Sequence, residues 1–174
     1  MAFSVGVLTA SDRGSRGERE DVSGKVIAEM VSTIGGEVTS YRVVSDDLEA
    51  LKAAMIEMAD REKVTLLLTT GGTGFSPRDN TPEATAAVAE RQVPGIPEAI
   101  RAYSMKITPR AMLSRATAGI RGRTLIINMP GSPKAVREVL EFILPVLPHG
   151  LDVLAGDVAD CGLPGQGDVM KKKE

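Results

Sequence analysis

Short apolar runs alternate along the chain with longer stretches in which apolar residues recur every three or four positions. Runs of four to eight residues are typical of strands, and the three-to-four spacing is typical of helices. The runs predict strands at 4–9, 37–44, 65–69 and 124–128. The spacing predicts helices at 22–34, 46–61, 82–90, 97–104 and 133–146. This alternation indicates an α/β fold, and the near-continuous strands indicate a sheet covered on both faces.

Several predicted helices begin with recognisable start signals. Thr81 and Ser132 each precede a proline, which favours a helix whose cap is the hydroxyl residue and whose first turn holds the proline. Asp46 lies three residues before Glu49, a spacing that resembles a capping box. Segment 115–128 resembles a hairpin with Arg121-Gly122 at its turn.

Length and composition narrow the class of protein. The 174 residues fit one domain, expected at 1–154, followed by a loose glycine-rich and charged tail at 155–174. The formal charge of −2 argues against nucleic acid as a partner. The apolar stretches at 64–68 and 139–147 are too short to cross a membrane, and no leader is evident, so we expect a cytoplasmic protein.

One cysteine (Cys161) and one histidine (His149) limit the possible metal chemistry. They exclude an internal disulfide and any site built from several thiolates or imidazoles, and we expect both residues to be structural or incidental. A metal ion here must therefore be a hard ion held by oxygen atoms, and Mg²⁺ is the default.

Polar residues follow three predicted strands, in segments 8–14, 67–79 and 126–133. Ligands of open α/β sheets bind beyond the carboxyl ends of the strands, so these segments should meet in one crevice. The glycines at 71–74 would let backbone N–H groups approach an anion, and the helix after Ser132 adds free N–H donors. The loop is neither a P-loop nor a dinucleotide fingerprint, since a third glycine would fall at Pro77.

Binding a nucleotide with micromolar affinity needs about 8 kcal/mol, whereas one helix terminus contributes about 0.3–1 kcal/mol. Charged side chains or a metal ion must therefore supply the rest of the binding free energy. Asp46 and Asp79 are best placed to hold Mg²⁺, and phosphate could be reached by Arg13, Arg78 and Arg115. Each has a structural alternative: Asp46 as a helix cap, Asp79 as a turn residue and the arginines as surface charges.

The segment GGTGFSPRDNTPEAT at 71–85 resembles the signature of the molybdopterin adenylyltransferases of molybdenum cofactor biosynthesis, whose relatives include the first domain of gephyrin. The resemblance covers roughly 3–147. Supporting matches are SDR at 11–13, VSDD at 44–47, AMLSR at 111–115 and NMPGSP at 128–133. This chain has Asn80 where the family more often has an apolar residue.

The resemblance implies a three-layer α/β/α fold with a mostly parallel sheet, a homotrimer, and transfer of AMP from ATP to the terminal phosphate of molybdopterin with release of pyrophosphate. It implies that Asp46 and Asp79 are essential and bind Mg²⁺, and that the product passes to a molybdenum-insertion enzyme. The residues implied to bind nucleotide and pterin are Ser11, Asp12, Arg13, Gly71, Gly72, Thr73, Gly74, Arg78, Ser114, Arg115, Asn128, Pro130, Gly131, Ser132 and Pro133.

Two other functions remain open at this stage. A carrier or scaffold would keep the pocket and bind molybdopterin without turnover. A phosphohydrolase would use the same carboxylates and Mg²⁺ to activate water, although no residue stands out as its base. Nucleotidyl transfer suits a chain without histidine or cysteine constellations, because such reactions depend on positioning and charge neutralisation.

Overall fold

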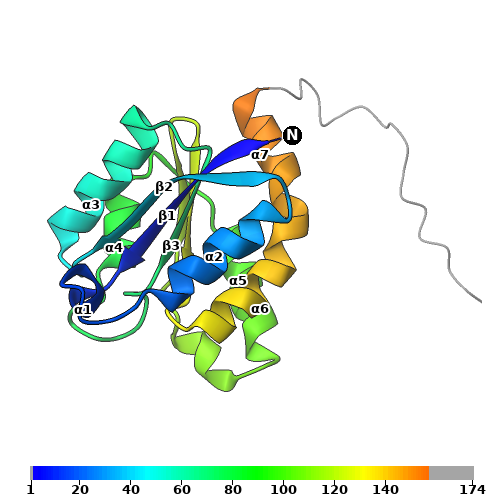
Figure 1. Cartoon of the computed structure of the whole chain (residues 1–174). Helices are drawn as coiled ribbons and strands as arrows, with labels where there is room; N and C mark the ends of the chain where they lie inside the picture. Colours follow the sequence, from blue (N-terminus) through cyan, green and yellow to red (C-terminus); the bar gives the residue numbers. More distant parts are fainter. Residues whose placement is uncertain (1, 157–174) are drawn as a thin grey trace, which may run out of the picture.

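The computed structural model describes residues 2–156, and within them the strands form one six-stranded sheet (Figure 1). The strand order is β2-β1-β3-β6-β5-β4. The parallel part comprises β2 (Gly36–Val44), β1 (Phe3–Ala10), β3 (Leu66–Thr70) and β6 (Thr124–Met129). Strands β5 (Ala118–Arg121) and β4 (Arg91–Gln92) continue the sheet in antiparallel pairing. The sheet is therefore mostly parallel, as predicted.

Helices cover both faces of this sheet and complete a three-layer fold (Figure 1). One layer holds α2 (Val22–Ser32), α5 (Gly95–Met105), α6 (Pro133–Ile143) and α7 (Leu147–Ala155). The other holds α3 (Leu48–Ile56), its π-helical extension η1 (Glu57–Arg61), and α4 (Thr81–Val88). The predicted α/β/α architecture is confirmed.

The central strands bury side chains on both faces. Val7 and Leu68 pack into the core beneath α2 and α6, whereas Leu8 and Leu67 pack beneath α3 and α4. Each of these four side chains is fully buried, which contributes about 1.5–3 kcal/mol per residue to folding. This two-sided burial explains the near-continuous apolar runs in the sequence. It also fixes the carboxyl ends of β1, β3 and β6 side by side.

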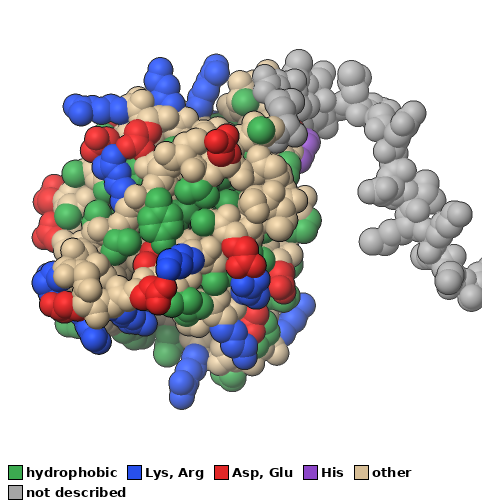
Figure 2. Space-filling model, viewed as in Figure 1, with side chains coloured by type: hydrophobic (Ala, Val, Ile, Leu, Met, Phe, Trp, Pro, Cys, Tyr) green, Lys and Arg blue, Asp and Glu red, His purple; other side chains and the backbone are tan. Residues whose placement is uncertain are grey.

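Strand β2 forms an exposed edge of the sheet. Figure 2 shows acidic and basic side chains interspersed around an apolar area that lies over this strand. Tyr41 contributes to the exposed apolar surface of β2, with 41% of its surface accessible. Charges of both signs thus alternate on this face.

Two of the predicted helix caps are shifted by one residue. The cap of α3 is Asp47, whose carboxylate accepts a hydrogen bond from Ala50 N at 2.9 Å, so the prediction of a cap at Asp46 is wrong. The prediction of a cap at Thr81 is also wrong: Thr81 is the first residue of α4, its hydroxyl donates to the Gly71 carbonyl (2.9 Å), and Asn80 holds the cap position without a side-chain cap hydrogen bond. Ser132 caps α6 as predicted, accepting from Ala135 N at 3.3 Å.

The remaining differences come from short elements and from prolines. The predicted helix 133–146 consists of α6 and the 3₁₀ turn η3 (Leu144–Val146), which contains Pro145, and the helix α7 that follows was not predicted. The short α1 (Asp12–Ser15), β4 and the 3₁₀ turn η2 (Pro109–Leu113) were also not predicted. The hairpin is confirmed, with its turn at Gly122 and Arg123 between β5 and β6.

Cys161 and residues 157–174, which make up nearly all of the predicted tail, lie outside the described residues. Among the described helices, none has both the length and the apolar character needed to span a membrane.

Candidate active site

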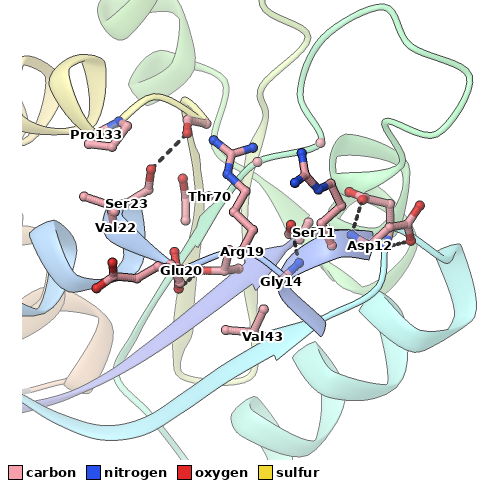
Figure 3. Close-up of a pocket in the computed structure, with 18 of the residues that line it drawn as sticks. Ser11, Asp12, Gly14, Arg19, Glu20, Val22, Ser23, Val43, Thr70 and Pro133 are labelled. Carbon is pink, nitrogen blue, oxygen red and sulfur yellow. Dashed lines mark hydrogen bonds between the residues drawn. The ribbon is translucent and has the colours of Figure 1, made fainter. Parts of the chain in front are cut away.

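The loops that follow β1, β3 and β6 meet at the carboxyl edge of the sheet and enclose a cavity of about 390 Å³ (Figure 3). This is the convergence that the sequence predicted. Among the predicted site residues, those lining the cavity are Ser11, Asp12, Arg13, Asp46, Gly71, Gly72, Asp79, Gly131 and Pro133. Segments far apart in the chain therefore form one polar pocket.

Asp12 and Asp46 connect two of these loops through a reciprocal pair of hydrogen bonds. The backbone N–H of Asp12 donates to Oδ2 of Asp46 at 2.8 Å, and the N–H of Asp46 donates to Oδ1 of Asp12 at 3.0 Å. Arg78 also donates to both carboxylate oxygens of Asp12, at 2.8–3.1 Å. The Asp12 carboxylate is thus occupied by protein donors, whereas Asp46 has no basic side-chain partner among residues 2–156.

The surroundings shift the pKa values of Asp46 and Asp12 in opposite directions. Burial raises the pKa of Asp46, and the nearby carboxylates of Asp12 and Asp79 raise it further. The hydrogen bonds from Arg78 and from the Asp46 backbone lower the pKa of Asp12. A raised pKa means that the ionised form of Asp46 is poorly compensated by the protein. A bound cation would supply that compensation.

Asp79 has a structural role and a place in the cavity lining. Its backbone N–H donates to the Ser76 carbonyl at 2.9 Å, and its Oδ2 accepts from Ser76 N at 3.0 Å. The interpretation of Asp79 as a turn residue is therefore confirmed. Asp79 is also one of the residues that line the cavity, and its charge is close enough to raise the pKa of Asp46. Asp79 thus both stabilises the turn and lines the cavity.

The glycine-rich loop adopts a backbone conformation that few other residues tolerate. Gly71 and Gly72 have φ angles of +88° and +65°. A Cβ on Gly72 would lie 2.4 Å from the Thr81 hydroxyl and 3.4 Å from Oδ1 of Asp46. The loop thus brings its backbone against the acidic cluster, where only glycine fits.

Arg115 holds the same loop from the outside. It donates to the Gly74 carbonyl at 2.7 Å and to the Asp79 carbonyl at 2.6 Å, and it pairs with Glu83. The structure therefore uses Arg115 to position the loop that carries Asp79. Its phosphate-binding role from the sequence analysis stays a prediction.

Four predicted site residues line neither this cavity nor the neighbouring one described next: Arg78, Arg115, Asn128 and Ser132. Asn128 is fully buried: its amide donates to Thr69 and Thr85 at 3.0 and 2.8 Å, and its oxygen accepts from Thr117 N at 3.1 Å. Ser132 serves as the cap of α6. Arg78 is exposed and reaches the cavity through its pair with Asp12. The structure therefore places Asn128 in the core.

A second cavity of about 310 Å³ adjoins the first, and Gly131 lines both. It lies between α5, η2 and α6, and its walls include Ile100, Ile107 and Leu113. Four further predicted site residues line this second cavity: Thr73, Gly74, Ser114 and Pro130. Most of the predicted set thus divides between a polar cavity and a more apolar one.

Several cavity residues were missed in the sequence. Asp21 caps α2, accepting from Gly24 N at 2.9 Å, and also accepts from the hydroxyls of Thr9 (2.6 Å) and Tyr41 (2.5 Å). Ser23 donates to the Gly131 carbonyl at 2.9 Å and so links α2 to the β6 loop. An aspartate directly before the predicted helix at 22–34 is a cap signal that could have identified Asp21.

The acidic side chains of the polar cavity fit one mode of Mg²⁺ binding. Within residues 2–156, no cluster of three or more acidic, histidine or cysteine side chains is arranged to hold a metal ion. Mg²⁺ needs no such cage, since one or two carboxylates with substrate phosphates and water complete its octahedron. Asp46 and Asp79, close together and short of cationic partners, fit that mode.

Comparison with known proteins identifies the family. The family model described as "Probable molybdopterin binding domain" matches residues 6–149. The Helicobacter pylori molybdopterin adenylyltransferase is 44% identical over 159 residues, which cover 90% of each chain. Gephyrin of Dictyostelium discoideum is 46% identical over 160 residues, covering 86% of this chain and 22% of gephyrin.

Solved structures agree. The molybdopterin biosynthesis enzyme MoaB of Thermus thermophilus superposes with a TM-score of 0.84 and 51% identity, covering 88% of this chain and 97% of that chain. The match confirms the resemblance seen in the sequence motifs. The chain therefore belongs to the molybdopterin-binding family that includes the molybdopterin adenylyltransferases and gephyrin.

Proposed function

We propose that this chain is a molybdopterin adenylyltransferase, which transfers AMP from ATP to the terminal phosphate of molybdopterin and releases pyrophosphate. Relatives named for this activity match 90% of the chain at 44% identity, and another, from Escherichia coli, matches 84% at 37%. The observation that carries the proposal is the junction at Gly131 of two cavities, one of which is also lined by Asp46 and Asp79.

We assign the polar cavity to ATP and the apolar cavity to the pterin. The polar cavity holds the acidic cluster, the positive-φ glycines and the amino-terminal end of α2, which suit a metal-bound polyphosphate. The second cavity offers apolar walls to a flat ring system, with Ser114 and Arg110 at its lining for polar contacts. The shared wall brings the two reacting phosphates together.

The chemistry requires little of the protein beyond positioning and charge neutralisation. An oxygen of the pterin phosphate attacks the α-phosphorus of ATP, and the bond to the β-phosphate oxygen breaks with its electron pair leaving on pyrophosphate. A phosphate monoester is ionised at neutral pH, so no general base is needed. Asp46 and Asp79 would hold Mg²⁺, which supplies neutralisation of the phosphate charge. Backbone N–H groups of the glycine loop would orient the phosphates.

We further propose that the chain works in the cytoplasm as a homotrimer and passes its product to a molybdenum-insertion enzyme. Exposed apolar side chains beside the second cavity offer a surface for self-association, and they include Met105, Ile107, Met112 and Leu113. Light scattering on the purified protein checks this point, and a monomer at working concentrations would contradict it.

The test of the activity is a product assay. Purified protein with molybdopterin, ATP and Mg²⁺ should form adenylylated pterin, detected by mass spectrometry. Asp46→Asn should strongly reduce the amount of product, whereas Glu49→Gln, on the exposed side of α3, should not. Molybdopterin that is bound but unchanged in the wild type would support a carrier. ATP consumed without pterin would support a phosphohydrolase.

A further inference from the structure

Acidic side chains outnumber basic ones in the lining of the polar cavity. The carboxylates are Asp12, Glu20, Asp21, Asp46 and Asp79, and the cationic side chains are Arg13 and Arg19. ATP carries several negative charges of its own. A polyphosphate can enter such a cavity only where positive groups offset the repulsion.

Three of these carboxylates already have partners that are not Arg19. Asp12 pairs with Arg78, Glu20 pairs with Lys25 at 2.5 Å, and Asp21 accepts hydrogen bonds from three donors. Arg19 itself forms no hydrogen bond or ion pair with any residue in the described range 2–156. Its five N–H donors are therefore available to a ligand.

The segment before Arg19 is held in a compact form that presents this side chain to the cavity. Ser15 N donates to Ser11 O, Gly17 N to Gly14 O, and Glu18 N to Arg13 O, each at 2.9 Å. Gly17 supplies the positive φ angle of +72° that the turn requires. Arg16 and Glu18 form a paired contact away from the cavity lining.

Figure 3 shows the consequence for the site. The Arg19 side chain extends into the pocket, on the side where Thr70 and Ser23 are drawn, whereas Asp12 lies at the other side of the view. Glu20 is labelled on the same side as Arg19, but its carboxylate is paired with Lys25, so Arg19 is a cationic side chain of this side of the cavity that is left to a ligand. The guanidinium fork suits phosphate oxygens, which it binds through paired N–H donors.

We propose that Arg19 is a substrate-binding residue that contacts the polyphosphate of ATP beyond its first phosphate. The inference rests on the proposed function, because it takes the polar cavity as the ATP site. AMP carries less charge than ATP and has no second or third phosphate, so it gains little from Arg19. The residue therefore raises affinity for the triphosphate over the monophosphate.

The test is calorimetric binding of α,β-methylene-ATP and of AMP, each with Mg²⁺. Arg19→Ala should weaken binding of the ATP analogue by about tenfold and change AMP binding by less than about threefold. Arg19→Lys should bind with intermediate affinity, because lysine keeps the charge and loses the fork. Arg16→Ala is the matched control: its partner is Glu18 and it does not line the cavity, so both ligands should bind as in the wild type.

Three results separate the possible failures. Wild-type affinity for the ATP analogue in Arg19→Ala overturns the inference and leaves the proposed function standing. Equal weakening for both ligands overturns the assignment to the outer phosphates. A wild-type protein that binds no ATP analogue overturns the proposed function and the inference with it. The thermal midpoint of Arg19→Ala should match the wild type, because Arg19 has no partner among the described residues to lose.

Discussion

A Cβ atom on Gly71 would lie 2.5 Å from the carbonyl oxygen of Ala10. Gly71 follows β3 and Ala10 ends β1, two neighbouring parallel strands. The backbone at Gly71 thus lies so close to the end of β1 that a side chain at position 71 would not fit. This contact sets the floor of the cavity and explains why the loop after β3 begins with glycine.

Gly71→Ala should therefore destabilise the protein strongly. The variant combines a positive φ angle with a clash against backbone, so we expect a loss of about 3 kcal/mol or more in the free energy of unfolding. Gly122→Ala is the control, because it has a positive φ angle (+54°) and open space around its Cβ, and should cost about 1 kcal/mol. Urea denaturation of both variants measures the difference. Equal losses would show that the contact with Ala10 is unimportant.

Asp46→Asn should separate activity from stability. The asparagine oxygen can still accept from the Asp12 backbone, so the link between the two loops survives. Loss of the charge should lower kcat/KM by about 10²-fold or more, as for other preorganised groups at developing charge. The thermal midpoint without Mg²⁺ should equal or exceed that of the wild type. A variant that unfolds while its folded fraction retains full activity would favour a structural role for Asp46.

The pH dependence of stability gives an independent check on Asp46. Its pKa in the folded state lies above the ordinary value of 3.8, so the folded protein holds this proton more tightly than the unfolded chain. The contribution of Asp46 to the stability of the wild type should therefore fall as pH rises from the ordinary pKa through the raised one, whatever the other carboxyl groups add. Asp46→Asn should not show this loss. Urea denaturation at about pH 4 and about pH 7, without metal, measures the free energy of unfolding of both proteins. The value for the variant relative to that of the wild type should be larger at the higher pH. A constant difference would contradict the assigned pKa direction.

Asn128→Ala should act on stability more than on catalysis. It removes a fully buried side chain and leaves Thr117 N without its side-chain acceptor, at a cost of about 2–4 kcal/mol. Ser132→Ala removes only the cap of α6 and should cost about 0.5–2 kcal/mol. Thermal denaturation ranks the two variants. A stable Asn128→Ala variant with impaired ATP binding would contradict this prediction and support a ligand-binding role for Asn128.

The sequence predicted the parts of the fold that depend on local pattern. The strands around Val7, Leu67 and Ile126 were predictable because burial on both faces leaves a continuous apolar run. The start of α3 differs from the prediction because two adjacent aspartates could each cap the helix. In the structure Asp46 is hydrogen-bonded to Asp12, and Asp47 caps the helix.

The sequence predicted which loops form the candidate site, but it predicted few of the contacts between their side chains. The three polar segments meet because parallel strands end at one edge. The reciprocal bonds between Asp12 and Asp46 join residues 34 positions apart, and nothing in the local pattern indicates them. The hydrogen bonding of the buried Asn128 in β6 likewise depends on Thr85 in α4. Arg19 lies in a turn whose form depends on backbone hydrogen bonds that composition does not reveal.

The most direct test of the central claim follows the phosphates of ATP with a radioactive label. The protein should be incubated with molybdopterin and Mg²⁺, in parallel with ATP labelled at the α- or at the γ-phosphate. Adenylyl transfer predicts that the α label appears in the pterin and the γ label in pyrophosphate, in equal amounts. A γ label released as orthophosphate, or an α label that remains in free AMP, would contradict the account.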